Sequence, residues 1–190
     1  MSGEQMSRIL VHDDVEHESF AQYMRSNGWR LEATDKTGRE GSQSIEEVWL
    51  NPTQTIAVHY LDNPRMMARS LWIRGYDIWP VVSDLSACFT GGPPEELLQN
   101  VADAQTVREL VKAIFRVAVV YKDAFDQTVF DMLSYYANDE DTPVRRAVVQ
   151  ALVYTEWSES RPLLEKIAKD DPVPDVRAFA TEVLRVVYRA

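Results

Sequence analysis

Histidine and carboxylate side chains gather in one short segment near the amino terminus, at His12, Asp13, Glu16 and His17. Side chains of these types bind transition-metal ions when three or four of them converge on one point. Asp13 and His17 are four residues apart, so they would share one face of a helix predicted over residues 13–27. The start of that helix also explains the carboxylates, because negative charge there interacts favourably with the helix dipole. We therefore predict no metal site in this segment.

A nucleophilic pair would need a thiol and a base, and the chain offers its only cysteine, Cys88, and His59. A catalytic cysteine requires a base within hydrogen-bond reach and a shaped site around both groups. The sequence around Cys88, LSACFTGG, resembles no catalytic cysteine motif, and a small buried thiol explains the residue more simply. The glycines form neither a phosphate-binding nor a dinucleotide-binding pattern. We predict no catalytic residue and no cofactor.

Acidic residues outnumber basic residues along the whole chain. The formal net charge is −10, with 8 basic and 13 acidic residues in 1–90 and 12 and 17 in 91–190. Nucleic acids and anionic membranes bind to positive surfaces, so neither partner is expected. A nucleic-acid function would need one concave surface that gathers these residues: Arg108, Lys112, Arg116, Lys122, Arg145 and Arg146. The lone cysteine and an amino terminus without a secretory pattern favour the cytoplasm.

Glycine and proline mark a boundary near the middle of the chain. All seven glycines lie at or before Gly92, and Gly91-Gly92 is followed at once by Pro93-Pro94. Such a cluster separates structural elements. We predict an α+β domain over residues 1–92 and an all-helical domain over residues 93–190.

The first domain combines one helix with strands. Asp13 or Asp14 would cap the helix over residues 13–27, and Gly28 would end it. Apolar residues then recur at every second position, as in strands with one buried face. These strands are expected at residues 29–34, 45–50, 55–61 and 68–75. We predict an antiparallel meander of three or four strands with the helix packed on it.

The second domain contains a repeat. Apolar residues recur with the same spacing in segments that start at Val107, Val144 and Val176, and the last two are offset by 32 residues. This spacing gives each segment the wide apolar stripe of a helix buried on one face. Shorter amphipathic helices are predicted over residues 126–137 and 160–169. Helices that alternate at this period form an α-solenoid, here of about two and a half helical hairpins.

The two closest repeats resemble a known family. The runs NDEDTPVRRAVVQAL and KDDPVPDVRAFATEVL are similar to the acid–Pro–Val-Arg–Ala–Leu signature of bacterial HEAT and HEAT-like repeats, including the phycobilisome-lyase type. The likeness is strong over residues 138–187, looser over residues 106–137 and absent from residues 1–92, whose family is not recognised. It implies a helical scaffold that binds partners, and it implies no reaction.

The same resemblance suggests a structural role for the repeated arginines, Arg145 and Arg177. In HEAT-like stacks the arginine at this position pairs with acidic residues of neighbouring turns, for which the candidates are Asp139, Asp141, Asp171 and Asp175. An anion clamp is the alternative, because arginine is the usual ligand of phosphate and carboxylate groups. A ladder of charge-assisted hydrogen bonds explains the repetition directly, so we favour the structural role.

Several aromatic residues have no evident place in either core. Trp157, beside Glu156, lies in a loop at one edge of the predicted stack, while Trp72, Tyr76 and Trp79 lie where the first domain ends. Aromatic residues ringed by polar groups are typical of protein-binding surfaces. Packing between the two domains is the alternative for the last three. We take these five as the candidate partner-binding residues.

Two functions of different classes remain open. The favoured hypothesis is a cytoplasmic, non-enzymatic protein-interaction module whose acidic surface suits a basic partner, as in immunity-type or regulatory proteins. The alternative is a small-molecule or pigment-binding, lyase-type protein with a pocket between the two domains, lined by Trp72, Trp79 and His59. A deep pocket that converges on His59 would favour the second hypothesis. The sequence indicates no oligomeric state.

Overall fold

The computed structural model describes residues 3–38, 43–90 and 93–188. The chain divides into two compact units, Met1–Pro94 and Glu95–Ala190. The first unit combines helices with an antiparallel sheet and the second is helical, so the predicted α+β fold class is confirmed. Among the described residues, no helix is both long enough and apolar enough to cross a membrane.

A five-stranded antiparallel sheet forms the first unit. In chain order its elements are β1 (Gln5–Leu10), α1 (His17–Ser26), β2 (Arg30–Thr37), β3 (Ser44–Leu50), β4 (Ile56–Asn63), a short 3-10 turn (Pro64–Met66), β5 (Ala68–Gly75) and α2 (Trp79–Phe89). The strands lie in the order β1-β5-β4-β3-β2, so the first strand along the chain pairs with the last. β1 and β2 are therefore the edges of the sheet.

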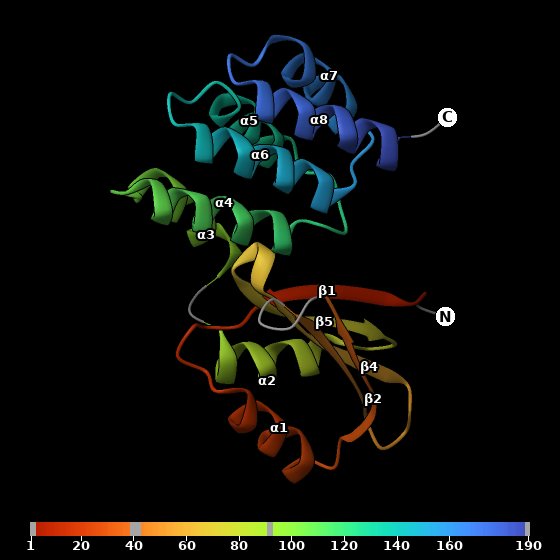
Figure 1. Cartoon of the computed structure of the whole chain (residues 1–190). Coiled ribbons are helices and arrows are strands. Elements are labelled where there is room, and N and C mark those ends of the chain that lie inside the picture. Colours follow the sequence, from red (N-terminus) through yellow and green to blue (C-terminus); the bar gives the residue numbers. More distant parts are fainter. Residues whose placement is uncertain (1–2, 39–42, 91–92, 189–190) are drawn as a thin grey trace. The chain divides into compact units, whose positions relative to one another are not determined.

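Both helices of this unit pack on one face of the sheet (Figure 1). Phe20 and Met24 of α1 and Leu85 and Phe89 of α2 are buried in one core with strand residues such as Trp49. The rings of Phe20 and Trp49 meet edge to face, with centroids 6.1 Å apart. Burial of such side chains stabilises the unit by about 1.5–3 kcal/mol each.

The four predicted strands are confirmed as β2 to β5, but β2 is exposed along its whole length, so the buried face expected for it is wrong. The strand β1 and the helix α2 were not predicted. The predicted amino-terminal helix begins only at His17, so the expected start at residue 13 is wrong. Glu16 occupies the N-cap position without a side-chain hydrogen bond, and neither Asp13 nor Asp14 caps the helix. Asp13 therefore shares no helix face with His17.

In the part of the second unit that the structure describes, six helices follow one another: α3 (Pro94–Asp103), α4 (Val107–Val120), α5 (Gln127–Tyr136), α6 (Thr142–Thr155), α7 (Ser160–Asp170) and α8 (Pro174–Val187). α6 packs against both α4 and α8, so the three long helices form one row (Figure 1). α5 packs on α6, and α7 on α8. The five predicted helices are present, and α3 adds a helix at the start of the stack.

The long helices begin at recognisable sequence signals. The Thr106 hydroxyl accepts a hydrogen bond from the Glu109 N–H, and the Glu109 carboxylate accepts one from the Thr106 N–H, which is a capping box. Pro143 and Pro174 lie in the first turns of α6 and α8, where a missing N–H breaks no intrahelical bond. The starts of these three helices are thus specified by the local sequence.

Candidate functional site

A buried ion pair links two turns of the helical unit. Arg145, in the first turn of α6, donates from Nε to Asp171 Oδ2 at 2.8 Å and from Nη2 to Asp171 Oδ1 at 3.3 Å. Its Nη1 donates to the backbone carbonyls of Asp139 and Glu140, at 2.9 and 3.1 Å. Arg145 is 5 % exposed and Asp171 is 7 % exposed. One guanidinium therefore joins the turn before α6 to the turn before α8.

The ion pair shifts the titration of both groups. Burial raises the pKa of the Asp171 carboxyl, but hydrogen bonds from Arg145 and from the Val173 N–H lower it more, so its pKa lies below the ordinary value. The hydrogen bond to Asp171 raises the pKa of Arg145. The donors that bond Asp171 and the two carbonyls are not available to an external anion.

Arg177 occupies the equivalent position in α8 and makes a different contact. It donates from Nη1 to the backbone carbonyl of Asp171 at 2.6 Å. Asp139 accepts the N–H of Asp141 on its own carboxylate at 2.8 Å. The carboxylate of Asp171 thus forms an ion pair with Arg145, whereas Asp139 offers Arg145 its backbone carbonyl, and Asp141 and Asp175 are exposed.

A pocket of about 300 Å³, here called the turn pocket, opens beside the ion pair. It lies between the α5–α6 turn and the α7–α8 turn, with Leu163 and Ile167 among its apolar residues. Its charged residues are the carboxylates of Asp139, Glu140, Asp170 and Asp171 and the cations of Arg145 and Lys166. Carboxylates outnumber cations, so the pocket favours a positively charged group.

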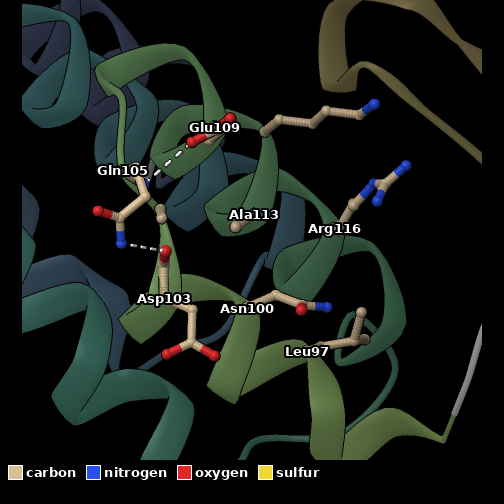
Figure 2. Close-up of a pocket in the computed structure, with 9 residues that line it drawn as sticks. Leu97, Asn100, Asp103, Gln105, Glu109, Ala113 and Arg116 are labelled. Carbon is tan, nitrogen blue, oxygen red and sulfur yellow. Dashed lines mark hydrogen bonds between the residues drawn. The ribbon is translucent and has the colours of Figure 1, made fainter.

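A larger pocket of about 420 Å³ lies between α3 and α4 and is here called the α3–α4 pocket. Figure 2 shows Asp103 and Glu109 on one side of it and Arg116 on the other, with Ala113 between Glu109 and Arg116 along α4. The pKa of Glu109 is lowered, mainly by the hydrogen bond from the Gln105 N–H and next by the hydrogen bond with the Thr106 side chain. The sequence did not predict this pocket, because α3 was not predicted.

Trp157 and Glu156, two of the predicted partner-binding residues, differ in exposure. Trp157 is only 5 % exposed, because its ring packs edge to face against Phe125 with centroids 5.2 Å apart. Its carbonyl accepts the Tyr188 hydroxyl at 2.8 Å. Glu156 is exposed and lies 3.3 Å from Lys122 Nζ. The surface at this edge therefore offers Glu156, while the indole of Trp157 serves internal packing.

Tyr76 and Trp79 lie in the turn that joins β5 to α2, residues 75–79, which we name the aromatic corner. Tyr76 is 57 % exposed and Trp79 is 56 % exposed. Trp79 is the first residue of α2. These two aromatics are the predicted partner-binding rings that remain at the surface.

Trp72, by contrast, is surrounded by side chains of its own sheet. The guanidinium carbons of Arg8 and Arg74 lie 5.3 and 5.4 Å from its ring centroid. The ring of His59, opposite Trp72 in the β4–β5 register, lies 4.8 Å away. His59 Nδ1 in turn lies 2.7 Å from Glu46 Oε1. His59 therefore has a carboxylate partner and an aromatic neighbour.

Cys88 is exposed, so the prediction of a buried thiol is wrong. The reason is the unpredicted helix α2, in which Leu85 and Phe89 face the core and residue 88 points outward.

The sequence also did not reveal a polar contact between the sheet and α1. The carboxylate of Glu47, a buried residue, accepts the Trp49 Nε1–H at 3.1 Å and lies 3.1 Å from His17 Nε2.

No three histidine, cysteine, aspartate or glutamate side chains gather as ligands of a metal ion in the ranges 3–38, 43–90 and 93–188. His12 and His17, from the amino-terminal cluster, have separate partners. His12 Nδ1 lies 3.5 Å from Asp14 Oδ2, and His17 reaches Glu47.

Comparison with known proteins identifies the second unit. No curated protein and no solved structure matches this chain. Residues 95–185 match the family model described as HEAT repeats, and the match covers neither the first unit nor a particular lyase type. The carboxy-terminal region of this protein is therefore HEAT-like.

Proposed function

We propose that this chain is a non-enzymatic protein-binding module of the cytoplasm that contacts its partner through the HEAT-like unit. The match of residues 95–185 to HEAT repeats carries this proposal. Repeats of this type generally mediate protein–protein interaction, because their stacked helices present an extended surface. The charge network around Arg145 is used internally, which agrees with a scaffold role.

Charge favours a basic partner. The net charge of −10 and the excess of carboxylates in the turn pocket attract positive surfaces and accelerate their association. Glu140 and Asp170 are the exposed carboxylates of that pocket. Immunity-type or regulatory binding, in which an acidic protein covers a basic surface, is the form of function that this charge supports.

The experiment uses the full chain as bait, with quantitative mass spectrometry of the retained proteins at low and high salt. A double charge reversal, Glu140→Lys with Asp170→Lys, is compared with Asp131→Lys and Glu159→Lys, which change the net charge equally at exposed sites outside the turn pocket. We expect the first pair to lower recovery of a basic partner by about tenfold or more and the second pair to change it little. A bait that retains no protein at micromolar concentration would refute the proposed function.

The α3–α4 pocket supports a second candidate function, binding of a small molecule. Its volume of about 420 Å³ falls within the range of ligand sites. Its charged and amide lining suits a polar ligand better than an apolar pigment. Asn100→Trp would obstruct this pocket, whereas Ala102→Trp lies on α3 outside its lining. A thermal shift with polar metabolites that only Asn100→Trp abolishes would favour this second function.

A further inference from the structure

The backbone of the aromatic corner is fixed at its first residue. Gly75 has φ of 145°, and a Cβ atom there would lie 2.2 Å from the carbonyl oxygen of Thr55, so only glycine fits. This close approach lets the Tyr76 N–H donate to the same carbonyl at 3.2 Å. The direction in which the chain leaves the sheet at Tyr76 is therefore set by the neighbouring turn.

The other end of the corner is fixed as well. Asp77 has φ of 53°, which is uncommon for a residue other than glycine. The side chain of Ile78 is fully buried in the core, and its N–H donates to Gln5 Oε1 of β1 at 3.2 Å. Trp79 then starts α2. Because this backbone is already fixed, binding of a partner here costs little backbone conformational entropy.

The aromatic corner itself carries one charged side chain, that of Asp77, and the exposed Arg74, the residue before the corner, lies 3.8 Å from Glu4 Oε1. Residues 76–90 contain two acidic residues, Asp77 and Asp84, and no lysine or arginine. Both carboxylates are exposed. Residues 51–55, the turn that contacts Gly75, carry no charge. Tyr76 and Trp79, both more than half exposed, thus flank an exposed carboxylate in the sequence, and the neighbouring Arg74 has a carboxylate partner of its own.

We propose that the aromatic corner binds an arginine side chain in a basic segment of a partner protein, which rests on the proposed function of protein binding. A guanidinium stacks on the faces of tryptophan and tyrosine and can pair with a carboxylate through two parallel hydrogen bonds. Tyr76 and Trp79 supply the ring faces, and the exposed Asp77 between them in the sequence supplies the carboxylate. The ammonium of lysine is more strongly hydrated and lacks the planar fork, so the corner distinguishes the two residues.

The same observations argue against two other occupants. A second copy of this chain would bring negative charge to negative charge, because the copy carries the same net charge of −10. A membrane surface with anionic lipids would be repelled by Asp77 and by the net charge of the chain. A basic protein segment satisfies both the rings and the carboxylate.

The test is an NMR titration of the full isotope-labelled chain with an arginine-rich octapeptide. Peptides with lysine or with citrulline in place of arginine are the matched probes, because the first keeps the charge and the second keeps the planar group. We expect shifts of the Trp79 indole and the Tyr76 amide to saturate, with the arginine peptide binding about fivefold or more tighter than either matched probe.

Variants test the assignment to the corner. Trp79→Ala and Tyr76→Ala each remove a side chain that is more than half exposed, so both should fold, and each should weaken the arginine peptide about fivefold or more. Tyr135→Ala, which removes an exposed tyrosine of α5, is the control and should leave the affinity unchanged.

Several results would overturn the inference. Equal affinity for arginine and lysine peptides would show that binding depends on positive charge alone, and the arginine site would be excluded. Shifts confined to residues 95–190 would place peptide binding in the HEAT-like unit, which would sink the arginine site and leave the proposed function standing. Corner shifts that depend on protein concentration without peptide would identify a second copy as the occupant.

Discussion

Arg145 and Asp171 lie 26 residues apart and form a two-point hydrogen-bonded ion pair inside the helical unit. The same guanidinium holds the two carbonyls of the turn before α6. Asp171 also accepts the Val173 N–H at 2.8 Å, which fixes the turn before α8. The pair therefore joins the turns of two consecutive repeats. Its removal should lower the free energy of unfolding of the helical unit more than it lowers the affinity for a partner.

Truncation of the arginine should destabilise the helical unit strongly. Arg145→Met leaves the Asp171 carboxylate buried without its partner, which costs about 3–5 kcal/mol in the free energy of unfolding. Urea denaturation followed by far-ultraviolet circular dichroism measures this loss. Arg161→Met is the control, because Arg161 pairs with Glu165 at the surface, and its loss should cost less than about 1 kcal/mol. Equal effects of the two substitutions would contradict the role given to the buried pair.

Acid should weaken the same link. The pKa of Asp171 is lower in the folded protein than in the unfolded chain, so its contribution to stability is complete above the ordinary aspartate pKa of about 3.9. That contribution is lost as the pH falls through the lowered folded value. The urea midpoint should therefore fall more steeply between about pH 5 and pH 3 in the native chain than in Asp171→Asn. Parallel curves for the two proteins would show that Asp171 does not titrate as described.

Much of the helical unit could be predicted because its signals are local. The Val-Arg register defined α4, α6 and α8 from apolar spacing alone, and the match to HEAT repeats agrees with it. The resemblance to HEAT-like repeats implied that Arg145 pairs with an acidic residue of a neighbouring turn, and the packing of two repeats selects Asp171 among the four candidates. Local periodicity therefore carries most of the information in a solenoid, whose contacts run between neighbours.

The missed elements were missed for different reasons, since α3 has an apolar stripe of its own and α2 does not. α3 follows the Gly-Gly-Pro-Pro cluster, which favours a loop. α2 (WPVVSDLSACF) has apolar residues around most of its circumference, so no single stripe indicates a helix. The burial of Trp157 depends on Phe125 and Tyr188, about one repeat away on either side, and no local pattern reports such contacts.

A methyl group at Gly75 should disrupt the aromatic corner. Gly75→Ala places Cβ 2.2 Å from the Thr55 carbonyl and forces alanine to adopt a positive φ, so we expect the first unit to lose more than about 2 kcal/mol of stability. Gly3→Ala is the matched control, since nothing lies within 4 Å of a Cβ at that position, and its effect should stay within about 0.5 kcal/mol. Thermal unfolding of both variants measures the difference. A neutral Gly75→Ala would mean that the corner is not fixed by the Thr55 turn.

The two units should fold independently, as the predicted domains 1–92 and 93–190 require. Each unit has a buried core of its own, one around Trp49 and Phe20 and the other around Ile114 and Leu152. Fragments 1–94 and 95–190 should therefore each give a cooperative thermal transition, and their circular dichroism spectra should add up to that of the full chain. Trp157 is the single tryptophan of fragment 95–190, so tryptophan fluorescence, excited selectively over tyrosine, reports the unfolding of the helical unit directly. A fragment that stays unfolded by itself would show that one unit needs the other, and the predicted boundary would then divide a single domain.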